Sequence, residues 1–107
     1  MLTLVPSKSF EVEVAIPMPT GKDAKIKVGF KHKGRKALEE WLKTDDGENA
    51  EPKKDFEALA EVIEHWKGID AEYSEENLEV LLDSYPAAGR ALISGYLQAM
   101  LEGKVKN

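Results

Sequence analysis

The sequence has no cysteine in its 107 residues. Disulfide bonds and thiolate metal sites are therefore excluded, and the fold must rest on packing alone, which suits a reducing cytosol. No apolar run approaches the ~20 residues that span a bilayer. Residues 1–6 show no basic segment followed by an apolar run, so no secretory signal is expected. The apolar share of 42% is typical of a globular chain, and the length fits one domain, residues 1–107.

Metal-ligating residues are also sparse. His32 and His65 are far apart in the sequence, and neither has a second histidine or a carboxylate at a characteristic ligand spacing. A zinc site usually needs three or four such ligands. We therefore interpret both as ordinary surface histidines and expect no metal site.

Motifs for nucleotide binding or catalysis are missing as well. Gly21 and Lys22 do not form a phosphate-binding loop, because Ile16 and Asp23 occupy positions where that motif needs glycine and Ser or Thr. The carboxylate pairs, such as Asp45 and Asp46, fall in hydrophilic positions where solvation keeps their chemistry ordinary. We predict no catalytic residue and no cofactor, and so a protein that is not an enzyme.

Charge is unevenly distributed along the chain. Residues 1–36 hold 8 basic and 3 acidic residues, a net charge of +5, whereas residues 37–107 hold 7 basic and 17 acidic residues, a net charge of −10. This asymmetry indicates either two electrostatically different faces or an ordinary solvated surface. The basic stretch 22–36 supports an alternative function, a small nucleic-acid-binding regulator. Its candidate contacts are Lys25, Lys27, Lys31, Lys33, Arg35 and Lys36.

Period-two alternation predicts a β-hairpin over residues 10–31. Apolar residues occupy every second position of 10–16 and again of 26–30, and the segment between them is rich in proline and glycine. In the predicted pairing Glu11 and Glu13 face Lys25 and Lys27, which would help to set the register. A second copy of the chain can pair with the hairpin's free edge, so a homo-oligomer is possible and the sequence does not decide it.

From Arg35 onward the pattern is helical. We predict helices over 35–43, from Pro52 to Trp66 with a stop at Gly68, from a Ser74 cap to Tyr85, and over 87–102 with a stop at Gly103. We also predict a polar loop over residues 44–51 and a loose tail over 104–107. The predicted fold class is α+β and mainly helical, with an N-terminal hairpin followed by four helices in the helical part, 35–103.

The last predicted helix is apolar on most of its circumference. A stripe of small residues includes Ala91 and Gly95, and larger apolar residues cover much of the rest. Such a helix is either a central core helix or a surface that binds a partner helix. Both are true if most of the helix fills the core and its end reaches the surface. The candidate partner-binding residues are Leu92, Ile93, Tyr96, Leu97, Met100 and Leu101.

Three stretches of the sequence resemble a known family. They are Trp66-Lys67-Gly68-Ile69-Asp70, Tyr73-Ser74-Glu75-Glu76-Asn77-Leu78 and Leu81-Leu82-Asp83-Ser84-Tyr85-Pro86-Ala87-Ala88. Together with the N-terminal hairpin they are similar to the tail assembly chaperones of long-tailed, siphovirus-type bacteriophages and prophages. The resemblance covers most of the chain, from Phe10 to Asn107.

This resemblance implies a function and partners. Such chaperones bind the long helical tape measure protein, keep it soluble and help to recruit tail tube subunits. They act in the cytoplasm of the bacterial host and are absent from the mature virion. Many have a longer form, made by a programmed frameshift, that contacts the tube protein; this chain ends soon after its fourth helix, as a short form would.

Overall fold

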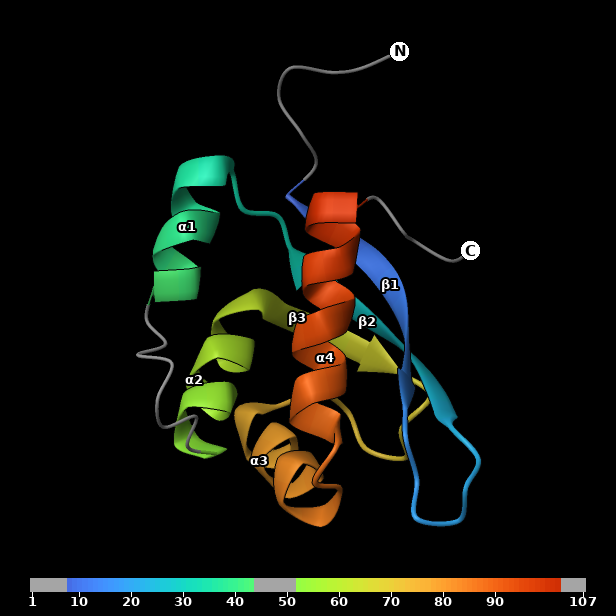
Figure 1. Cartoon of the computed structure of the whole chain (residues 1–107). Coiled ribbons are helices and arrows are strands. Elements are labelled where there is room, and N and C mark those ends of the chain that lie inside the picture. Colours follow the sequence, from blue (N-terminus) through green and yellow to red (C-terminus); the bar gives the residue numbers. More distant parts are fainter. Residues whose placement is uncertain (1–7, 44–51, 103–107) are drawn as a thin grey trace.

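The computed structural model describes residues 8–43 and 52–102. Two strands, β1 (Ser9–Ile16) and β2 (Ala24–Lys31), come first and are followed by α1 (Arg35–Lys43) and α2 (Pro52–Val62). A third strand, β3 (Ile63–Lys67), precedes α3 (Glu75–Ser84) and α4 (Ala88–Leu97), and a π-helical turn, η1 (Gln98–Glu102), extends α4. The fold is α+β, as predicted (Figure 1).

The predicted hairpin is confirmed. β1 and β2 pair antiparallel, with Phe10 opposite Phe30 and Val14 opposite Ile26, so the apolar residues of both strands share one buried face. Glu13 lies opposite Lys27, as predicted, but Glu11 lies opposite Gly29 and Lys25 opposite Ala15. The prediction for Glu11 is therefore wrong, because the register sets it against a residue with no side chain.

The predicted helix through Trp66 is wrong beyond Val62. Residues 63–67 form β3, which pairs antiparallel with β2. The sheet order is therefore β1-β2-β3, and β2 is the central strand. A bulge between Gly29 and Phe30 pairs Gly29 with His65 but Phe30 with Ile63, so Glu64 is an extra residue in the strand. Ile63 and Trp66 are both buried at a spacing of three, which imitates helical periodicity. Gly68, with φ of 94°, follows a strand and not a helix.

The remaining helices agree with the prediction. Ser74 caps α3, its hydroxyl accepting a hydrogen bond from the Asn77 amide at 3.0 Å, and Glu75 and Glu76 lie in the first turn. Pro86 separates α3 from α4. The predicted loop 44–51, the stop at Gly103 and the tail 104–107 lie outside the described residues.

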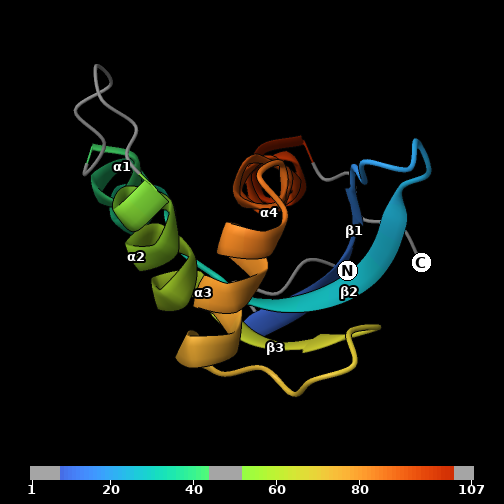
Figure 2. The same cartoon turned by 90° about the horizontal axis from the view of Figure 1, so that it is seen from below.

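The core fills the space between one face of the sheet and the helices. Figure 2 shows α3 and α4 on the same side of the sheet. Apolar side chains of all three strands meet those of the helices there; they include Val12, Val14, Ile26, Val28, Phe30, Ile63, Leu59, Val62, Leu78, Leu92 and Tyr96. Each large side chain buried in this way contributes roughly 1.5–3 kcal/mol to folding. The packing holds α4 against β1 and so determines which side of α4 faces outward.

Candidate partner-binding site

The inner side of α4 belongs to the core. Leu92 and Tyr96 have no exposed area, and Tyr96 is the largest fully buried side chain. Its ring centroid lies 4.9 Å from that of Phe30, 5.2 Å from that of Trp41 and 6.1 Å from that of Phe10. The Tyr96 hydroxyl donates a hydrogen bond to the Lys31 carbonyl at 2.9 Å. Burial, with a smaller contribution from the Glu61 carboxylate, raises the pKa of Tyr96 to about 12.

Two of the six candidate partner-binding residues, Leu92 and Tyr96, therefore lie in the core. Leu92 and Tyr96 cannot contact a partner on the surface of the folded domain, because the sheet and the other helices already cover them. The same pair of residues fixes α4 to the fold. Of the other four, Ile93, Leu97 and Met100 are half-buried and Leu101 is 65% exposed.

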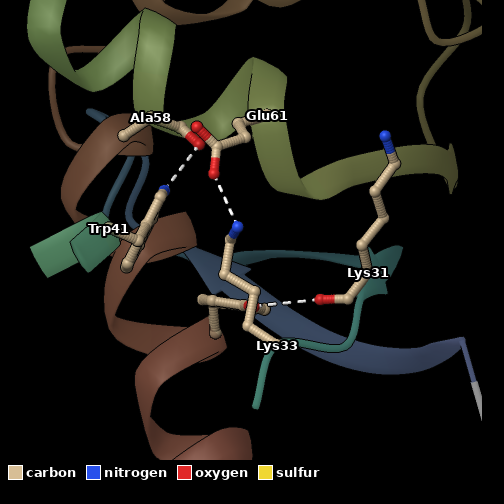
Figure 3. Close-up of polar contacts among 6 residues, drawn as sticks. Lys31, Lys33, Trp41, Ala58 and Glu61 are labelled. Carbon is tan, nitrogen blue, oxygen red and sulfur yellow. Dashed lines mark hydrogen bonds and ion pairs between the residues drawn. The ribbon is translucent and has the colours of Figure 1, made fainter. Parts of the chain in front are cut away.

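Polar contacts near Tyr96 join α1 and the segment just before it to α2. The Trp41 indole N–H donates to the Ala58 carbonyl at 3.1 Å, and the Lys33 ammonium lies 2.6 Å from a Glu61 carboxylate oxygen (Figure 3). Such a partly exposed ion pair contributes at most about 1 kcal/mol. These contacts hold α1 against α2, and Trp41 of α1 in turn packs against Tyr96 of α4.

A polar ridge follows the outer side of α4 and continues to the first residue of η1. Arg90, Ser94 and Gln98 follow one another at intervals of four and are all exposed. At about 100° per residue, Leu92 and Tyr96 lie roughly 160° around the helix from Ser94, while Ile93 and Leu97 flank the ridge. Sequence reasoning missed this ridge, although three polar residues at helical spacing in an otherwise apolar helix are a usable signal of its exposed side.

A first groove lies on one side of the ridge, between α4 and β1. It has a volume of about 500 Å³, and its helical wall includes the small residues Ala87, Ala91 and Gly95. Val14 and Ala15 of β1 contribute to the opposite wall. A Cβ on Gly95 would lie 3.0 Å from Val14 Cγ2, so the glycine allows α4 to approach β1 closely. Part of the predicted small-residue stripe thus serves packing against the sheet.

A second groove lies on the other side of the ridge, beside the start of α2. Its volume is about 420 Å³, and Ile93, Leu97 and Leu101 line it together with Asp55 and Arg90. The structure therefore brings three of the predicted partner-binding residues into one groove. Met100 does not line it and is half-buried against the core.

The polar face of the sheet holds a separate charged cluster. A Glu11 carboxylate oxygen lies 3.1 Å from the Lys67 ammonium and 3.2 Å from His65 Nε2, and the hydrogen bonds of these two side chains hold the pKa of Glu11 below its usual value. The contact crosses the central strand above Gly29, where a Cβ would collide with the His65 ring. Glycine at position 29 is thus required for a side-chain link between the two outer strands.

The residues proposed for nucleic-acid binding are only partly together. Lys25, Lys27 and Lys31 are exposed along β2, on the face opposite the helices. Lys33 is paired with Glu61, and Glu11 and Glu13 lie on the neighbouring strand. The exposed side of α3 carries Glu75, Glu76, Glu79 and Asp83, which agrees with two electrostatically different faces.

Within the described ranges 8–43 and 52–102, no three His, Cys, Asp or Glu side chains converge in a way that could hold a metal ion. In the same part of the chain, no helix combines the length and the apolarity that crossing a membrane requires.

Open grooves bordered by apolar side chains are typical of domains that take up segments of other proteins. The chain belongs to the phage tail assembly chaperone family, whose model matches residues 1–107, the whole chain. No curated protein and no solved structure matches it. Membership assigns the chain a chaperone role in phage tail assembly, which takes place inside the host cell and involves protein partners. Chaperone families are generally non-enzymatic.

Proposed function

We propose that the chain binds the tape measure protein of its phage, keeps it soluble, and helps to recruit tail tube subunits while the tail assembles. It acts in the cytoplasm of the host and is absent from the finished virion. Recruitment of the tube protein takes place through a longer, frameshifted form. Family membership supports a chaperone role in tail assembly, and the partners and the longer form are our proposal.

The second groove is the observation that carries this proposal. Ile93 and Leu97 present partly buried apolar surface there, and Leu101 extends it into solvent. An amphipathic helix binds such a surface with apolar residues at helical spacing. A groove of this size makes a modest contact, which arriving tube subunits can displace, and many copies along one rod add avidity.

Co-expression with the tape measure protein of the same phage tests the proposal. We expect wild-type chain to keep that protein in the soluble fraction, and Leu101→Asp to weaken their association at least about tenfold, or about 1.4 kcal/mol. Val80→Asp is the matched control, because Val80 is similarly exposed, at 60%, but lies on α3. Absence of any association at micromolar concentration would refute the function, and equal effects of the two variants would refute the groove.

The nucleic-acid alternative has weaker support. The exposed lysines of β2 favour it, while the glutamates of β1 and the Lys33–Glu61 pair oppose it. It predicts a mobility shift that falls steeply as salt rises. No shift at low salt would remove this alternative.

A further inference from the structure

The outer edge of β1 carries backbone groups that no other strand of the described residues pairs. The Lys8 carbonyl accepts the His32 amide at 2.8 Å, so Lys8 and His32 are a hydrogen-bonded pair in the antiparallel register. Because such pairs alternate, Phe10, Val12, Val14 and Ile16 bond to β2. The backbone N–H and C=O groups of Glu11, Glu13 and Ala15 then point away from β2. In the sheet order β1-β2-β3, no strand among the described residues lies on that side.

This edge borders the first groove. Glu13, Val14 and Ala15 line one side of it, and the small residues of α4 line the other. An added strand would lie about 4.8 Å from β1. Its backbone would bond to the edge, and its inward side chains would enter the space left by Ala91 and Gly95. The groove therefore combines backbone groups that no described strand pairs with room for alternate side chains, the two requirements of strand addition.

Charge indicates which residue fits directly opposite Glu13. Glu13 takes part in no ion pair among the described residues, although Lys27 lies opposite it on β2, and Lys25 and Arg90 line other parts of the groove. A neighbouring strand with Lys or Arg opposite Glu13 would gain a favourable cross-strand pair, whereas Asp or Glu at that one position would be repelled.

A second copy of the chain fits this edge poorly. In antiparallel self-pairing, registers centred between Glu11 and Glu13 set glutamate against glutamate. Registers displaced toward Ala15 bring Pro17, which has no N–H, into the new ladder. The same residues that admit a basic strand thus discourage association of two copies through β1.

We propose that the edge of β1 at Glu11, Glu13 and Ala15 takes up an extended segment of the tape measure protein by strand addition. The segment carries Lys or Arg where it faces Glu13 and small apolar side chains where it enters the groove. This inference rests on the proposed function, and it assigns that function a second contact, distinct from the groove at Leu101.

Amide hydrogen exchange measured by NMR tests the proposal on the wild-type chain. In the free chain, the amides of Glu11, Glu13 and Ala15 should exchange rapidly and those of Val12 and Val14 slowly. In the complex with the tape measure protein, the first three should slow by at least about tenfold, because each gains a hydrogen bond. A complex in which these amides stay fast overturns strand addition but leaves the proposed function intact.

A pair of variants separates the backbone contact from the charge. Glu13→Pro removes an outward N–H at a position where an edge strand tolerates proline. Glu13→Ala, the matched control, keeps the N–H and removes the charge. Both should fold, and Glu13→Pro should weaken binding roughly tenfold more than Glu13→Ala. Equal affinities for the two folded variants overturn the proposal; if Glu13→Pro does not fold, the exchange experiment decides.

Three further outcomes also decide the question. Slow edge amides in the free chain at every concentration mean that the chain covers its own edge. Slowing that rises with chain concentration, together with a dimer in sedimentation, means that a second copy does so. Either result overturns the proposal. Failure of the wild-type chain to bind the tape measure protein overturns the proposed function and strand addition with it.

Discussion

The apolar residues of α4 and η1 lie in two different surroundings. On the inner side, Leu92 and Tyr96 are completely covered by the sheet and by neighbouring helices. On the outer side, Ile93, Leu97 and Leu101 border an open groove. The difference shows that an apolar residue on a helix becomes core or surface according to what packs against it, and α4 has more apolar surface than the core covers.

Removal of the Tyr96 side chain should have the largest effect on this comparison. Tyr96→Ala leaves a cavity among Phe10, Phe30 and Trp41 and removes the hydrogen bond to the Lys31 carbonyl. We expect a loss of about 3–5 kcal/mol in the free energy of unfolding, measured by chemical denaturation. A loss below about 1 kcal/mol would mean that the inner side of α4 is not core.

Gly95 marks the boundary between the two sides. A leucine there must displace Val14 or move α4 away from β1, since even a Cβ would lie 3.0 Å from Val14 Cγ2. We expect Gly95→Leu to destabilise the domain by about 1–3 kcal/mol. Ser94→Leu, on the exposed ridge one residue away, should change stability by less than about 0.5 kcal/mol. Similar thermal unfolding of the two variants would contradict the close contact.

The pH dependence of stability sharpens the description of the inner side. Tyr96 has a pKa of about 12 in the folded chain, against an ordinary value of 10.0. The unfolded chain therefore releases this proton first, and the stabilisation from neutral Tyr96 is complete below pH 10 and is lost as pH rises toward 12. The stability advantage of wild type over Tyr96→Phe should shrink across that range. Parallel pH profiles in urea denaturation would contradict a raised pKa.

The smallest effect on stability should come from the outer side. Leu101→Ala removes a side chain that is 65% exposed, so we expect a change within about 0.5 kcal/mol in the free energy of unfolding. Leu92→Ala, on the buried side of α4, should cost about 2–5 kcal/mol. A large loss from Leu101→Ala would show that η1 packs more tightly than its exposure indicates.

Much of the fold could be predicted because its signals are local. Period-two alternation identified both hairpin strands, and Ser74 with its two following glutamates identified the start of α3. β3 could not be predicted in this way, since its bulge changes the spacing of Ile63 and Trp66 from two to three. Only the pairing with β2, more than 30 residues earlier, makes this segment a strand.

The candidate site could be predicted only in part for a similar reason. The apolar character of α4 is visible in the sequence, but the side that packs inward depends on where β1 and α2 lie. The polar ridge at Arg90, Ser94 and Gln98 was available as a local signal and indicates the outer side. A free hairpin edge was expected, but no local signal indicates that β3 pairs with β2 and leaves the edge of β1, because this follows from the order of strands in the sheet.

The hydrogen bond between Tyr96 and Lys31 joins residues 65 positions apart in the chain. During synthesis, the hairpin leaves the ribosome long before the helix that must cover it. A product truncated ahead of Tyr96 would expose Phe30 and Val28 to solvent and would be expected to enter degradation. The chain can therefore complete this part of its core only after α4 has been synthesised.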